Sequence, residues 1–150
     1  MAVPEKLQEI LDTLELVPDR SDRIQFLISL AEQFKPVSSE IAAKPYPEQS
    51  RVPGCESEAF VFATASNEGT LDYHFAVENP QGVSAMALAA ILQQGLSGAP
   101  LAQIQQVPDE LVYSVFGREL SMGKSMGLIH MVQMVKALAQ SHSNKETMTS

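Results

Sequence analysis

The chain contains a single cysteine, Cys55, and its position makes it the first candidate for chemistry. It directly follows Pro53 and Gly54, so its side chain leaves a tight bend and not the middle of a helix or strand. A thiolate there could act as a nucleophile or accept a sulfur atom. One cysteine excludes an internal disulfide, a Cys-x-x-Cys redox pair and a multi-thiolate zinc or iron–sulfur site. A lone cysteine is also often a small buried hydrophobic residue, and the residues alone leave both interpretations open.

Charged residues that could influence this thiol lie beside it and far along the chain. Glu56 and Glu58 disfavour a thiolate, whereas Arg51 favours one. Lys124 lies near the predicted start of the last helix, with Ser121 as its N-cap. A lysine and free amide groups at a helix start would together stabilise a thiolate, a persulfide or a carboxylate. The alternative for Lys124 is a solvated surface lysine.

Two histidines could serve the thiol as a general base. His74 lies on the polar face of a predicted strand and His130 on the polar face of a predicted helix. No short spacing links either one to Cys55, so solvated histidines are the simpler interpretation. Methionines at helical spacing indicate core filling or a soft surface for a partner, namely Met122, Met126, Met131 and Met134.

Length and composition predict one soluble domain. The chain has 150 residues, of which 45% are hydrophobic and 19% charged. Ten basic against eighteen acidic residues give a net charge of -8, which disfavours nucleic acid and an anionic membrane surface as partners. The sequence shows neither a basic region followed by an apolar core at its start nor a membrane-spanning apolar run. It therefore predicts a cytoplasmic protein.

Hydrophobic periodicity predicts the elements that must position these residues. Alternation over 71–77, the β-prone residues 59–63 and the turn residues 66–69 between them indicate an antiparallel hairpin. The residues 35–54 contain several prolines and no useful period, so they predict a long loop leading to Cys55. Helices are expected over 5–16, from the N-cap Ser21 to Pro36, from Asn79 to Gly95, over 100–106 and 108–116, and over 124–140.

This order of elements predicts an α+β fold with helices packed on one face of a small antiparallel sheet. Residues 1–140 form the expected domain, and the polar residues 141–150 are expected to be a disordered tail.

The segment from Ser50 to Ser57 resembles the SufE-like sulfur-acceptor family, whose pattern is close to Asn-x-Val-x-Gly-Cys-x-Ser followed by a strand. The late Ser-x-x-Lys-Ser-x-Gly-Leu element, Ser121 to Leu128, and the order of the helices extend the resemblance over residues 5–140. It implies a SufE/NifU-like fold. Where many members carry arginine this chain has Lys124, which keeps the charge but not the planar fork.

The resemblance implies a sulfur carrier and not an enzyme with turnover of its own. Cys55 would accept sulfur as a persulfide from a pyridoxal-phosphate-dependent, SufS-like cysteine desulfurase, stimulate that enzyme, and pass the sulfur to a SufBCD-like iron–sulfur scaffold. Lys124 would stabilise the thiolate or persulfide, Arg51 would do the same or assist docking, and Gly54 would be the loop hinge. The protein would need no cofactor of its own, because the pyridoxal phosphate belongs to the desulfurase. A homodimer is left open.

Alternatives remain from the residues. The resemblance also implies a NifU-like cluster scaffold as an alternative, but clusters normally need more thiolates than Cys55 provides. A thiol enzyme would use Cys55 with His74 or His130 as its base. A helical interaction module would leave the cysteine inert.

Overall fold

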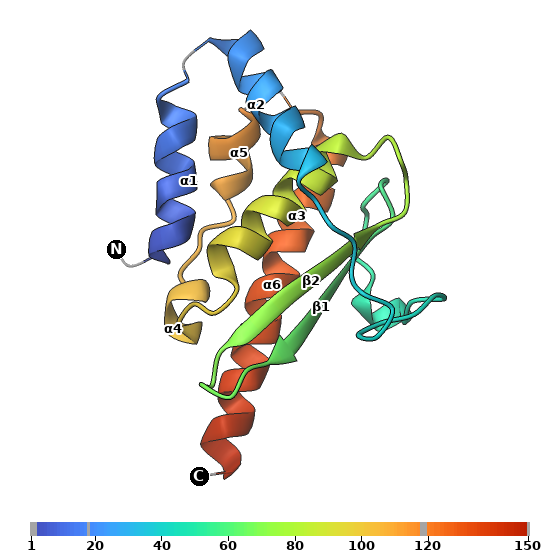
Figure 1. Ribbon diagram of the computed structural model, residues 1–150, viewed down its shortest axis with the longest axis vertical. Coiled ribbons are helices and arrows are strands. Elements are labelled where there is room, and N and C mark those ends of the chain that lie inside the picture. Colours follow the sequence, from blue (N-terminus) through green and yellow to red (C-terminus); the bar gives the residue numbers. More distant parts are fainter. Residues whose placement is uncertain (1–2, 18, 118–119, 150) are drawn as a thin grey trace.

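The computed structural model describes residues 3–17, 19–117 and 120–149 and confirms the predicted α+β class. A two-stranded antiparallel hairpin lies against a group of helices (Figure 1). The elements in chain order are α1 (Glu5–Glu15), α2 (Arg20–Glu32), the 3-10 turn η1 (Glu48–Ser50), β1 (Ala59–Ala65), β2 (Leu71–Val77), α3 (Val83–Leu96), α4 (Leu101–Ile104), α5 (Leu111–Phe116) and α6 (Met122–Thr149).

The hairpin has two differently covered faces. The predicted antiparallel hairpin is confirmed, and its register runs from Ala59 opposite Val77 to Ala65 opposite Leu71. Side chains of the inner face, among them Tyr73, belong to the main hydrophobic core together with the helices. The long loop before Cys55 covers the outer face. There the ring centroid of Tyr46 lies 5.0 Å from that of Phe60 and 5.4 Å from that of Phe62.

Helix α3 is the centre of the helical layer, because it packs against α1, α2, β2 and α6. Its residues are mostly small or aliphatic and are buried on nearly all sides, from Ala85 to Leu96. The helix begins at Val83 and not at Asn79 as predicted. The reason is local: the Asn79 side chain accepts a hydrogen bond of 2.9 Å from the Gln81 backbone N–H, which forms a turn instead of a helix start.

Other predicted helix boundaries also differ from the structure, those of α2 and α6 among them. Asp19, and not Ser21, is the N-cap residue of α2. Helix α6 continues past Gln140 to Thr149, so the described part of the expected disordered tail is helical. No glycine or proline follows Gly127 to end the helix, and the Gln140 side chain donates to the Asn144 side chain one turn later, at 3.1 Å. Residue 150 lies outside the described residues.

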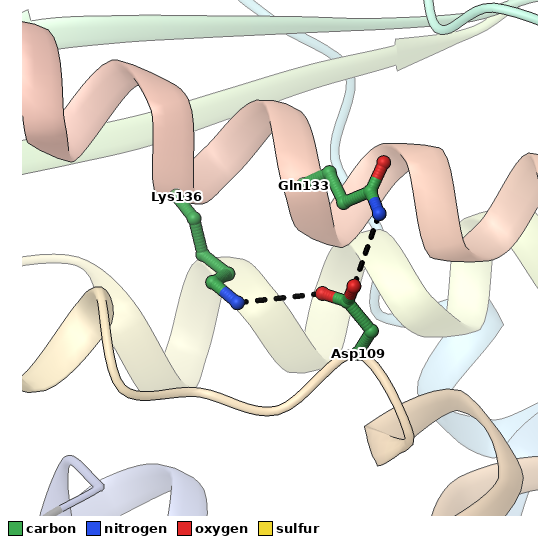
Figure 2. A network of polar contacts seen from close by, with 3 residues as sticks. All are labelled: Asp109, Gln133 and Lys136. Atoms are coloured by element: carbon green, nitrogen blue, oxygen red, sulfur yellow. Dashed lines mark hydrogen bonds and ion pairs between the residues drawn. The ribbon is translucent and has the colours of Figure 1, made fainter.

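A polar network ties the segment between α4 and α5 to helix α6 (Figure 2). The carboxylate of Asp109 accepts hydrogen bonds from Gln133 at 3.0 Å and from Lys136 at 3.3 Å. Both donors lie on α6, so the network fixes the long helix against the short helices. None of the helices in residues 3–17, 19–117 and 120–149 is both long and apolar enough to cross a membrane.

Candidate functional site

Cys55 lies on a short loop, residues 53–58, which we call the Cys55 loop. The loop is closed at its base, where the Val52 N–H donates to the Ala59 carbonyl at 2.8 Å. Within it the Glu58 N–H donates to the Cys55 carbonyl at 3.1 Å. Gly54 has a φ of 66°, in the left-handed region that favours glycine. The predicted bend before the cysteine is therefore confirmed, and glycine is required there by the backbone.

The loop is also fastened to the end of β2. The Glu78 N–H donates to the Glu58 carbonyl, and the Asn79 N–H donates to the Ser57 carbonyl, each at 3.1 Å. These bonds continue the pairing of the hairpin onto the loop. As a result Cys55 is held where β2 leads into helix α3.

The side chain of Cys55 is partly exposed and lines a cavity of about 100 Å³. Three chain segments form the walls: the Cys55 loop, the start of α3 and the first turns of α6. Lys124 is one of the lining residues, so the structure brings together the two candidates that the sequence could not connect. The lining residues are Cys55, Glu56, Ser57, Gln81, Gly82, Val83, Ser84, Ala85, Gly123, Lys124, Gly127 and Leu128.

The cavity lies at the N-terminal ends of two helices, α3 and α6. Backbone N–H groups at a helix start have no partner within the helix, and the helix dipole makes this end positive. Lys124 adds a full positive charge in the first turn of α6, where Ser121 Oγ accepts its N–H at 3.3 Å, as predicted. The cavity that Cys55 lines is therefore bordered by two positive helix ends and a lysine.

Glu56 opposes this effect at the same helix end. A methyl group built on Gly123 would lie 3.6 Å from Glu56 Oε1, which places the carboxylate beside the first turn of α6. The carboxylate and a Cys55 thiolate would thus share one positive helix end. The acidic neighbour recognised in the sequence is therefore part of the electrostatics of the site.

Arg51 is not among the residues that line the cavity. Its guanidinium carbon lies 5.6 Å from the ring centroid of Phe60, in cation–π contact, and its backbone forms a bridge with Phe60. Arg51 thus packs on the strand that follows the Cys55 loop. The structure gives its expected thiolate-stabilising role no geometric support.

Gly127 lets helix α6 approach the Cys55 loop. A Cβ atom at this position would lie 3.0 Å from the Cys55 Cα atom and 3.1 Å from the Gly54 carbonyl oxygen. Both distances are shorter than ordinary contacts, so any larger residue would push the loop away from the helix. Gly127 therefore sets the separation between the cysteine and the helix that carries Lys124.

Neither candidate histidine lines the cavity. His74 Nε2 lies 3.0 Å from Thr64 Oγ1 on the hairpin. His130, expected to be a solvated residue of α6, instead lies 2.7 Å through Nδ1 from the carbonyl oxygen of Pro53. This contact was not predicted. No local spacing indicated it, because the partner residue lies 77 positions earlier in the chain.

The start of α3 was not predicted as a wall of the site, because the helix was expected to begin at Asn79 and begins at Val83. Among the residues the structure describes, no group of three or more His, Cys, Asp or Glu side chains is arranged to hold a metal ion.

Fold and site together define a protein that carries one thiol on a closed loop between two helix starts. Residues 8–139 match the family described as "SufE: Fe-S metabolism associated domain", and the chain belongs to this family. It is 28% identical over 138 residues to "SufE-like protein 1, chloroplastic/mitochondrial" of Arabidopsis thaliana, covering 91% of this chain but only 35% of that longer protein. A solution structure of a hypothetical protein from Thermus thermophilus shares the fold, with a TM-score of 0.71, 23% identity and coverage of 95% of this chain and 98% of the other.

Proposed function

We propose that this protein accepts sulfur as a persulfide on Cys55 from a pyridoxal-phosphate-dependent cysteine desulfurase, stimulates that enzyme, and delivers the sulfur to an iron–sulfur scaffold. Membership of a family associated with Fe-S metabolism supports the pathway. The observation that carries the chemistry is the place of Cys55, partly exposed in a cavity walled by two helix starts and Lys124. Such a site favours a sulfur anion.

The transfer step needs one thiol and no redox partner. The Cys55 thiolate attacks the outer sulfur of the desulfurase persulfide, a new S–S bond forms on Cys55, and the old S–S bond breaks. The desulfurase thiolate leaves with the electron pair of that bond and takes up a proton. The number of S–S bonds is unchanged, so the single cysteine of the chain is sufficient.

Exposed apolar side chains beside the cavity support docking to a protein. Val83, at the cavity wall, is 41% exposed, and Met126 and Met122 on α6 are 45% and 80% exposed. Met131, by contrast, is fully buried, so the predicted methionine face divides into a core part and a surface part. Large exposed apolar residues near a reactive group are typical of a contact surface. The exposed carboxylate of Glu56 at the same place favours a partner with basic groups.

The rival functions have less support. A cluster scaffold needs several cysteine ligands, and this chain has one. A thiol enzyme needs a base within reach of the nucleophile. His74 and His130 instead contact Thr64 and the Pro53 carbonyl, respectively.

Replacement of the thiol tests the proposal. The wild-type protein, incubated with a cysteine desulfurase and cysteine, is expected to gain the mass of one sulfur atom, and a reducing thiol should remove it. Cys55→Ser removes the acceptor while adding no bulk, so it should show no gain and no stimulation of the desulfurase. Intact-mass measurement and sulfide release report the two effects. An unmodified wild-type protein, or the same gain on Cys55→Ser, would contradict the proposal.

The charge of Lys124 can be tested separately. Lys124→Gln should slow sulfur acceptance about two- to fivefold, because it removes one cation from the cavity wall while an exposed charge has only a modest effect. Lys124→Arg keeps the charge and should retain most of the rate. Initial rates of persulfide formation on Cys55 measure both. Equal slowing of the two variants would show that the charge is not what matters.

A further inference from the structure

Helix α6 contacts the Cys55 loop through a hydrogen bond that the proposed sulfur transfer does not use. His130 Nδ1 lies 2.7 Å from the carbonyl oxygen of Pro53, a residue 77 positions earlier in the chain. A carbonyl oxygen can only accept a hydrogen bond, so Nδ1 carries the proton and donates it. The ring is partly buried, and a methyl group on Gly54 would lie 3.7 Å from the same nitrogen. The imidazole therefore sits directly against the bend that precedes Cys55.

The hydrogen bond from His130 attaches the half of the Cys55 loop that precedes Cys55, residues 53 and 54, to helix α6. The hydrogen bonds to Ser57 and Glu58 fasten the half of the loop that follows Cys55. On the other half, Pro53 has no N–H to donate and Gly54 permits several backbone conformations. Both residues are exposed. The contact with His130 is thus a hydrogen-bonded tether between this half of the loop and α6, beside the close packing of Gly127 against Gly54 and Cys55.

We propose that His130 is a positioning residue that holds the Cys55 loop in its closed conformation through the Pro53 carbonyl, and so keeps the Cys55 sulfur partly buried until a partner docks. In the closed loop Cys55 packs against the main hydrophobic core. Because Cys55 is only partly exposed there, movement of the loop away from α6 would expose more of its side chain. The tether therefore opposes exposure of the thiol, and its importance for sulfur transfer rests on the function proposed above.

The expected effect of removing the His130 hydrogen bond follows from the net contribution of one hydrogen bond to stability. Removing the donor should raise the population of the open loop about fivefold, the equivalent of about 1 kcal/mol. Exposure of the thiol should rise by the same factor, because the open form is the reactive minority.

Alkylation of native protein by iodoacetamide, followed by intact mass, measures this exposure. His130→Ala and His130→Phe, the second of which keeps a ring of similar size without the donor, should both react about fivefold faster than wild type. His130→Asn places an amide N–H near the position of Nδ1 and should react within about twofold of wild type. Gln133→Ala is the matched control, since it removes a different hydrogen bond of α6 and should leave the rate unchanged.

Three results would overturn the proposal. His130→Phe reacting at the wild-type rate would show that ring packing, and not the hydrogen bond, holds the loop. His130→Asn reacting as fast as His130→Ala would show that a donor at this position has no effect. Faster labelling of Gln133→Ala by the same factor would mean that general loosening of α6 explains the result.

A desulfurase assay connects the tether to sulfur transfer. If loop opening is part of docking, the apparent KM of the desulfurase for His130→Ala should fall about fivefold relative to wild type, with kcat unchanged. An unchanged KM would show that the loop opens without His130 being displaced and would overturn the role in transfer. A wild-type protein that accepts no sulfur would refute the proposed function, while the alkylation series would still decide the role of His130.

Discussion

Cys55 is placed by the residues next to it, and Gly54 has the most stringent requirement among them. At a φ of 66° a side chain would clash with its own backbone, whereas the space around the residue is adequate. The nearest atom to an added Cβ is His130 Nδ1 at 3.7 Å, which is an ordinary contact. The bend before the cysteine therefore depends on backbone conformation and not on packing.

Gly54→Ala should lower the free energy of unfolding by about 1–2 kcal/mol, because the left-handed backbone conformation is unfavourable for a residue with a Cβ atom. Gly54→Asn should lose clearly less, since asparagine tolerates this region better. Urea denaturation of the three proteins measures the difference. Equal losses for alanine and asparagine would show that the side chains clash with the surroundings instead.

The site depends on how close helix α6 lies to the Cys55 loop and on where α3 begins. Two helix starts converge on one cavity because β2 delivers the chain to α3 beside the loop, while α6 returns from the far end of the sequence. The arrangement places two positive helix ends beside the cavity that Cys55 lines, without a cluster of basic side chains. It is compatible with a chain whose net charge is -8.

Gly127→Ala should destabilise the protein by about 1–3 kcal/mol, although alanine is the better helix former, because the new methyl group would overlap the Cys55 backbone. Gly123→Ala is the matched control on the same helix. Its methyl group would lie 3.6 Å from Glu56 Oε1, so its stability should be unchanged or slightly higher. Thermal or urea unfolding of wild type and the two variants measures the difference in stability. A neutral Gly127→Ala would mean that the loop moves aside at no cost.

The whole molecule is joined across its layers by a buried tyrosine. Tyr73, on β2, donates its hydroxyl to the Val135 carbonyl of α6 at 3.0 Å. Burial raises the pKa of its phenol well above the ordinary value near 10. The unfolded chain therefore ionises at this residue before the folded protein does. The stabilisation is complete below about pH 10 and is lost as the pH rises beyond it.

Tyr73→Phe should make stability less sensitive to alkaline pH. At about pH 11, wild type should have lost about 1.4 kcal/mol more than the variant, relative to neutral pH. The reason is that the unfolded chain has then lost the phenol proton while the folded protein keeps it, and a difference of one proton changes the stability by about 1.4 kcal/mol per pH unit. At neutral pH the variant should be about 1 kcal/mol less stable, since the hydrogen bond to Val135 is gone. Urea titrations at both pH values measure this. If the stability of wild type and of Tyr73→Phe changed equally with pH, Tyr73 would not be the source of the alkaline sensitivity.

The sequence by itself determined the elements and the candidate nucleophile of this protein. The hairpin could be predicted because side chains alternate across a strand, the α+β class followed from the order of the elements, and a single cysteine limited the chemistry to one thiol. Helix boundaries were less accurate, because a side chain such as Asn79 can form a turn where a cap was expected.

Only the tertiary structure decided which residues surround the thiol. Lys124 lines the cavity, Arg51 packs on Phe60, and His130 bonds to Pro53, although Arg51 is much nearer to Cys55 in the chain. Periodicity predicts which face of an element is buried, but not which distant element that face meets. That choice comes from the packing of α6 against the hairpin and from the close approach that Gly127 allows, which no local spacing encodes.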